Sequence, residues 1–223
     1  MAEKGVVVEF DFAVLDGAKL LFETAKGFLE GLDKIALDKT LEARYLAGSG
    51  YLEGLTRLFA LVKTKKTPQK AARELSAAFC AAVTAALPKA VGVSFRNFVK
   101  ALSDRDVHVV IATRANPEIA QQTFEPLLGE TVSLYQEVSD LYGSVRWDAW
   151  RRACMSAKLR YMSTLAITGS GSGVKSALIA RMGSVAVVND HVAYQDFGGA
   201  SDVVSELSGK TAKKVLQVLG LDA

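Results

Sequence analysis

The chain has 223 residues; half are apolar, 23% are charged, and the formal net charge is +3. This length and composition predict a globular protein with a sizeable core, and they argue against a disordered chain. The small net charge lacks the strongly basic character of a nucleic-acid-binding protein. The N-terminus has no basic region followed by an apolar run, and no apolar stretch is long enough for a bilayer. We therefore expect a cytoplasmic protein that binds neither membrane nor nucleic acid.

The chain begins with a pattern typical of a buried strand that ends in two acids. Val6, Val7 and Val8 are three β-branched residues in a row, as in a strand covered on both faces. Glu9 and Asp11 follow, with one apolar residue between them. Ligands of parallel sheets bind beyond the carboxyl ends of the strands, so this pair of carboxylates marks a candidate site.

Residues 17–92 show helical periodicity only, and we predict no strand in this block. One apolar face is formed by Leu20, Leu21, Phe28 and Leu32. A second stripe starts at Leu41 and continues past a glycine-rich break, and residues 71–87 form an alanine-rich helix. This block is therefore expected to be all-helical.

From residue 94 onward, short apolar runs alternate with helical patterns. Such alternation predicts an α/β architecture with a mostly parallel sheet that has helices on both faces. The expected strands are residues 107–112, 132–138, 164–168 and 185–188, and the expected helices are 118–128, 148–159, 174–182 and 201–219.

Two further strand ends carry residues suited to an anion. Thr113 follows the strand at 107–112 and precedes a helix, so its hydroxyl and the helix amides are placed to hold a phosphate oxygen; the alternative is a threonine that only caps the turn. Gly169 to Ser176 is a glycine- and serine-rich loop after the strand at 164–168. It fails as a nucleotide P-loop because Val174 separates Gly173 from Lys175.

The end of the first strand resembles the first motif of the haloacid dehalogenase-like superfamily, Asp-x-Asp-Gly-Thr-Leu. In this chain Glu9 stands for the first Asp and Asp11 for the second. Phe12, Ala13 and Val14 stand for the Gly, Thr and Leu. By this resemblance, Glu9 takes the position of the nucleophile and Asp11 that of the general acid/base.

The later motifs of the superfamily are matched only in part. Thr113 has the position of the second-motif hydroxyl. Arg146 lies at the distance expected for the third-motif cation, and Lys158 is the other candidate. The alternative is that Arg146 is an ordinary solvent-exposed arginine. The fourth motif, Gly-Asp-Ser-x-x-Asp, supplies acids that bind Mg²⁺. Ser170 and Val174 replace those acids here.

The order of the motifs is similar to that of the phosphoglycolate phosphatase and β-phosphoglucomutase type. Residues 179–188 and 199–204 also resemble stretches of this type. The resemblance implies a Rossmann-like three-layer core over residues 1–16 and 93–223, with an inserted all-helical cap over 17–92. Such relatives transfer phosphoryl groups through an aspartyl-phosphate, with Mg²⁺ offsetting the phosphate charge.

These replacements predict that phosphatase activity has been lost. Glu9 has an extra methylene that displaces its carboxylate by about 1 Å, and such a shift can cost about 100-fold in rate. Ser170 and Val174 remove metal ligands, so we expect no metal and no cofactor. Thr113 and Arg146 leave a site biased toward anions. The expected role is to bind a small phosphorylated ligand, a partner protein or a second copy of the chain.

The alternative prediction is a weak or altered phosphatase that acts on a small phosphorylated metabolite. It would use Glu9 or Asp11 and would need Mg²⁺. The sequence does not identify a ligand in either case.

Overall fold

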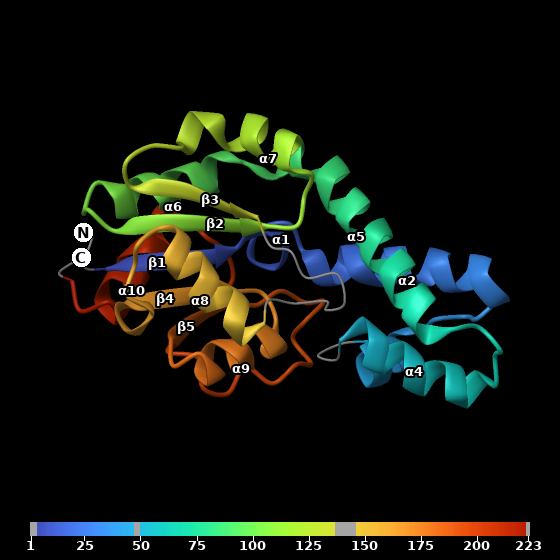
Figure 1. Ribbon diagram of the computed structural model, residues 1–223. Coiled ribbons are helices and arrows are strands. Elements are labelled where there is room, and N and C mark those ends of the chain that lie inside the picture. Colours follow the sequence, from blue (N-terminus) through green and yellow to red (C-terminus); the bar gives the residue numbers. More distant parts are fainter. Residues whose placement is uncertain (1–3, 47–49, 137–145, 222–223) are drawn as a thin grey trace.

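The computed structural model describes residues 4–46, 50–136 and 146–221. Its centre is a sheet in which every neighbouring pair of the six described strands is parallel, in the order β3-β2-β1-β4-β5-β6 (Figure 1). The strand order reverses at β1, which lies between β2 and β4, and ligands of open parallel sheets bind at such a reversal. The strands are β1 Gly5–Glu9, β2 His108–Thr113, β3 Val132–Gln136, β4 Thr164–Thr168, β5 Gly183–Val187 and β6 Asp202–Val204.

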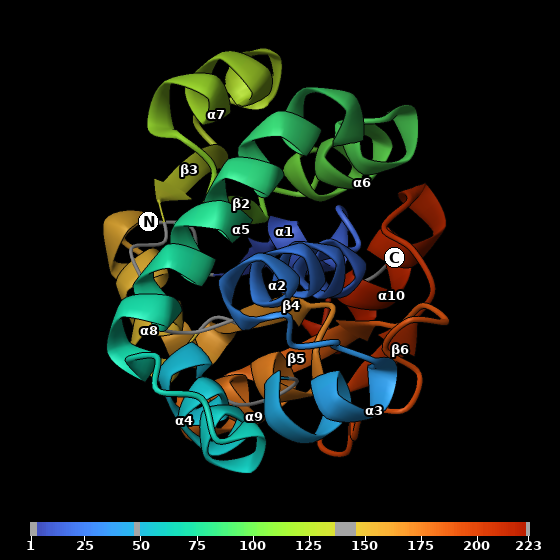
Figure 2. The same cartoon turned by 90° about the vertical axis from the view of Figure 1, so that its right-hand side faces the viewer.

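Helices cover both faces of the sheet, which confirms the predicted three-layer α/β class. The side chain of Val7 points to one face and packs with helices α8 and α9, whereas Val6 and Val8 point to the other face and pack with α6, α7 and α10. Figure 2 shows α6 and α10 on one side of the sheet and α8 on the other. These helices are α6 Val93–Ser103, α7 Pro117–Phe124, α8 Trp147–Ser156, α9 Gly171–Ile179 and α10 Gly209–Val218.

The segment between β1 and α6 is helical, as the sequence predicts. Helices α2, α4 and α5 lie beyond the carboxyl ends of the strands (Figure 1). The described elements here are α1 Phe10–Ala13, α2 Gly17–Asp33, α3 Lys39–Leu41, a π-helical turn Glu42–Leu46, α4 Tyr51–Val62 and α5 Pro68–Ala90. The domain boundaries at 16/17 and 92/93 stay a prediction.

The apolar core continues from the sheet into the helical segment. Phe12, just after β1, lies with its ring centroid 5.9 Å from that of Phe79 on α5. Leu55 and Leu58 of α4 belong to the same buried cluster as Val8 of β1. The helices are therefore held against the ends of the strands by the same hydrophobic burial that holds the sheet.

One predicted element is wrong in part. The sequence pattern predicts a helix over residues 201–219, but the segment begins with β6 and only then forms α10. Val204 is buried and pairs with Val187 of β5, which adds a sixth strand. Ser208 and Thr211 form a capping box that starts α10. The predicted strand 132–138 is found over its described part, and residues 137–138 lie outside the described residues.

Among the described residues, no single helix has both the length and the apolar composition needed to cross a membrane. The pair α5 and α6, bent by 81°, reaches that length and composition only when its two helices are taken together.

Gly169, directly after β4, fixes how closely this strand end approaches the end of β1. A Cβ atom at Gly169 would lie 1.9 Å from the carbonyl oxygen of Phe12. No side chain fits there unless the backbone moves.

The substitution Gly169→Ala is expected to lower the free energy of unfolding by about 1–3 kcal/mol, the range for overpacking a close-packed interior. The matched control is Gly27→Ala in α2, where a Cβ meets nothing within 4 Å. The control should be neutral or more stable by about 0.5–1 kcal/mol. Urea denaturation of both variants checks this, and equal stability of the two would contradict the close approach.

Candidate functional site

Buried polar side chains meet where β1, β2 and β4 end. Glu9 and Asp11 come from the end of β1 and the helical turn after it, Thr113 and Arg114 from the end of β2, and Thr168 from the end of β4. All five residues are at most 5% exposed. They converge because the carboxyl ends of adjacent parallel strands lie at one edge of the sheet.

Asp11 is held by three donors from the segment after β2. Its Oδ1 atom accepts a hydrogen bond of 2.6 Å from the Thr113 hydroxyl. Its Oδ2 atom accepts one of 2.9 Å from the Arg114 backbone amide and one of 3.2 Å from Arg114 Nη1. Hydrogen bonds to an ionised carboxylate are the stronger kind, so they fix this side chain firmly.

Glu9 is held from the opposite side of β1. Its Oε2 atom accepts a hydrogen bond from the Thr168 hydroxyl, and its Oε1 atom lies 3.6 Å from Arg114 Nη2 in an ion pair. Both carboxylates therefore face the same guanidinium.

Arg114 is the central cation of the cluster. Its guanidinium contacts Glu9 and Asp11 and lies 5.6 Å from the ring centroid of Phe12. The side chains of the three charged residues are at most 2% exposed, and buried charges of this kind persist only when they are paired. Two carboxylates and one guanidinium leave the cluster with a formal charge of −1.

The residues at this edge do not fit Mg²⁺, the metal that the resemblance implies. Ser170 caps α9, where its Oγ accepts a hydrogen bond of 3.0 Å from the Gly173 amide, and Val174 is fully buried. Mg²⁺ takes six oxygen ligands in an octahedron, usually one or two carboxylates with waters, but here the Arg114 guanidinium lies against both acids. Across the described ranges, no group of three or more His, Cys, Asp and Glu residues could hold a metal ion.

The helical segment covers the acid cluster. Tyr51 of α4 is 1% exposed, and its hydroxyl has no hydrogen-bond partner within the described chain. Burial raises the pKa of Tyr51 above its usual range, and the nearby charge of Arg114 opposes this rise. Burial likewise raises the pKa of Cys80 on α5, again opposed by Arg114. A neutral phenol and a neutral thiol thus lie within electrostatic range of the guanidinium.

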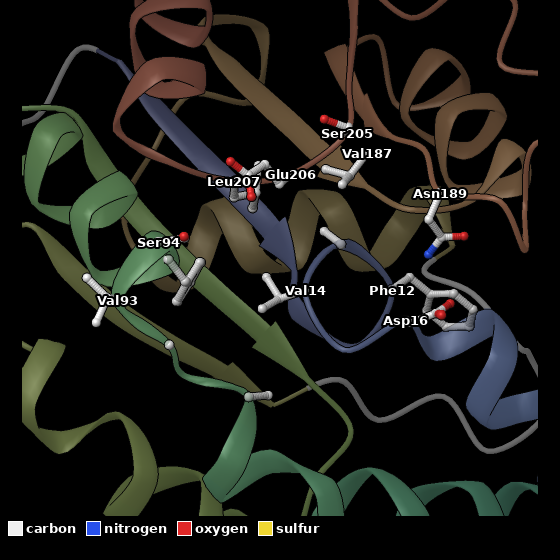
Figure 3. A pocket seen from close by; sticks show the side chains of 14 residues that line it. Phe12, Val14, Asp16, Val93, Ser94, Val187, Asn189, Ser205, Glu206 and Leu207 are labelled. Carbon is white, nitrogen blue, oxygen red and sulfur yellow. The ribbon is translucent and has the colours of Figure 1, made fainter.

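A cavity of about 320 Å³ lies beside this cluster, at the two connections between the sheet and the helical segment. Figure 3 shows Phe12, Val14 and Asp16 from the loop after β1, opposite Leu207 and Asn189 from the segments after β6 and β5. None of its fourteen lining residues is basic. This lining does not suit a phosphate group.

The two cations proposed from motif spacing lie at the two ends of α8. Arg146 is the N-cap of α8, is partly exposed, and its Nε atom lies 3.4 Å from Asp148. Its phosphate-binding role, like that of Thr113, stays a prediction. Lys158 is exposed and follows α8. Its neighbour Leu159 lies against Gly5 at the start of β1, so Lys158 is near the opposite edge of the sheet.

Sequence reasoning missed Arg114. The signal was its position directly after Thr113, at the end of a strand that pairs with the acid-bearing strand. A cation there neighbours both acids. The spacing of the motif directed attention to Arg146 instead.

Comparisons with solved structures reveal the fold family. The chain is 11% identical to β-phosphoglucomutase from Clostridium difficile, with a TM-score of 0.67 over 97% of this chain and 96% of that one. It is 18% identical to a predicted phosphatase from Clostridium acetobutylicum (TM-score 0.68, 97% and 100% covered). It is 12% identical to CbbY from Rhodobacter sphaeroides in complex with phosphate (TM-score 0.63, 92% and 95% covered).

These similarities show that the chain has the haloacid dehalogenase-like fold of the β-phosphoglucomutase and phosphatase type, as the motifs predict. No family model and no curated protein matches the sequence. At these sequence identities the comparisons establish the fold only, so the chemistry has to be inferred from the residues of the site.

The substitution Arg114→Met tests whether the guanidinium compensates the two buried acids. It should lower the free energy of unfolding by about 3–5 kcal/mol, because it leaves buried carboxylates without their counter-charge. The control Arg57→Met removes an exposed pair with Glu53 and should cost about 0.5 kcal/mol or less.

A double-mutant cycle separates charge from packing in this prediction. Adding Glu9→Gln to Arg114→Met removes one uncompensated charge, so it should restore part of the lost stability. If Glu9→Gln is equally destabilising in both backgrounds, the ion pair is not the origin of the effect.

Proposed function

We propose that this haloacid dehalogenase-fold protein does not hydrolyse phosphate esters and acts by binding a partner protein. The observation that carries the proposal is the Arg114 guanidinium between Glu9 and Asp11. Phosphoryl transfer by covalent catalysis needs a carboxylate free to attack in line and a cation placed to offset the phosphate charge. Here the attacking position is a glutamate already engaged by Thr168 and Arg114.

The charge of the cluster argues against phosphate as its ligand. Glu9, Asp11 and Arg114 sum to −1, and the hydroxyl proton of Thr113 is directed at Asp11. A phosphate would meet two carboxylates and a cation that is already paired. A phosphorylated ligand would therefore have to rely on Arg146 at the start of α8.

The outer surface of α8 and α9 supports a protein ligand. Arg151 lies 5.4 Å from the ring centroid of Trp147 and 4.7 Å from that of Tyr161, and it donates to the carbonyl oxygen of Ala180. Exposed apolar side chains lie on α8, on the turn after it and at the end of α9: Trp147, Met155, Met162 and Ile179. Trp, Tyr, Met and Arg are the residues enriched at protein interfaces.

The charge of this surface selects the kind of partner. Residues 146–181 contain seven Lys and Arg residues and a single acid, Asp148. An acidic protein surface with apolar side chains at its centre complements this arrangement. The alternative partner for this surface is a second copy of the chain, which a measurement of oligomeric state would detect.

A residual phosphatase is the second candidate, and one observation favours it. Asp11 and Thr113 keep the positions of the acid/base and the phosphate-holding hydroxyl, at the same strand edge. This candidate requires turnover that depends on Mg²⁺ and on Asp11.

A phosphatase assay with p-nitrophenyl phosphate and sugar phosphates, with and without Mg²⁺, separates the two functions. We expect no Mg²⁺-dependent turnover by the natural chain, because a guanidinium lies where the acids would hold a metal. The combined variant Glu9→Asp, Arg114→Ser, Ser170→Asp returns the first-motif acid and one of the two fourth-motif acids, and it should gain such turnover. Mg²⁺-dependent turnover by the natural chain that Asp11→Asn abolishes would refute the proposal.

A further inference from the structure

A second cavity, of about 560 Å³, lies where the π-helical turn of the helical segment meets the loop after β5. Its size is that of a small-molecule site. The charged and polar residues that line it are Lys39, Thr40, Glu42, Arg44, Asp190, His191 and Tyr194. It shares no lining residue with the cluster of Glu9, Asp11 and Arg114.

Glu42 is the notable residue of this cavity. It is 3% exposed, and it lines the cavity together with the cations Lys39 and Arg44. Burying a carboxylate is costly unless a positive group compensates its charge. Burial raises the pKa of Glu42 to about 7, and only Lys39 opposes this rise. The negative charge of Glu42 in turn helps raise the pKa of Tyr194, so the two side chains lie near each other across the cavity.

The backbone conformation at Glu42 is also unusual. Glu42 begins a π-helical turn, a rare conformation that recurs at functional sites. Opposite it, the ring of His191 lies 6.0 Å from that of Phe22 on α2, so this wall of the cavity packs against a long helix.

The charges around the cavity balance. Lys39 and Arg44 are basic, and Glu42 and Asp190 are acidic. A simple anion or a simple cation would satisfy only half of these groups. A molecule with an ammonium group at one end and an anionic group at the other would satisfy both halves.

We infer that this cavity is a binding site for a small zwitterion of the amino-acid class, whose ammonium group donates to Glu42 and whose carboxylate faces Lys39 and Arg44. The apolar part of such a molecule would lie against Ala43 and the ring of Tyr194. The inference does not depend on the proposed function, because it uses none of the residues at the ends of β1 and β2.

Isothermal titration with straight-chain amino acids, from glycine to 6-aminohexanoate, tests this site. Each is compared with the alkylamine and the alkanoate of the same length, at about pH 8, where Glu42 is ionised. At least one amino acid should bind about tenfold more tightly than both matched compounds. Lys39, Arg44, Asp190, His191 and Tyr194 are the titratable groups that also face the ligand.

The substitution Glu42→Gln should weaken that binding by about tenfold or more, because the amide lacks the charge that pairs with ammonium. The control Glu53→Gln makes the same change at an exposed position on α4 and should leave the affinity unchanged.

A stability measurement keeps the binding test independent of folding. Because folding raises the pKa of Glu42, the folded protein loses stability as the pH rises toward 7 and this group ionises. Glu42→Gln should therefore raise the urea midpoint at about pH 8 and leave it nearly unchanged at about pH 5. A folded variant that no longer binds supports the site. Absence of binding by every amino acid tested, or binding that Glu42→Gln leaves intact, overturns it.

Discussion

Glu9 and Asp11 are removed from solvent at the end of the central strand, and their charges must be compensated within the protein. Arg114 provides that compensation with one guanidinium, while Thr113 and Thr168 supply hydroxyl donors. The compensation is structural, because every group involved already has a partner inside the fold. We propose that these internal contacts replace the contacts that a metal and a phosphate would make at this site.

The position of the helical segment follows from the same cluster. Arg114 offsets one of the two buried acid charges, and its guanidinium and the Phe79 ring both lie near the Phe12 ring. The apolar core then runs without interruption from Val8 to Leu55. Binding through the outer surfaces, at α8 and α9 or beside Glu42, is consistent with a strand-edge site that is filled from within.

Much of the fold could be predicted from the sequence, because local patterns determine it. Runs of β-branched residues specified the buried strands, and their alternation with helices specified a parallel sheet. β6 was missed because its three residues are too short to show a period. Arg114 was missed for a different reason: a basic residue after a strand is exposed as often as not, and only the convergence of three strand ends brings it between two acids. The burial of Glu42 likewise depends on packing between distant segments.

We propose that the Arg114 guanidinium, which contacts Glu9 and Asp11, replaces a bound metal ion at this site. A crystal structure at high resolution, from crystals grown with Mg²⁺ and a phosphate mimic, tests it most directly. The account predicts that Arg114 still bridges the two carboxylates and that no ion contacts Glu9. An octahedral Mg²⁺ bound to Glu9 and Asp11, with Arg114 displaced, would contradict it.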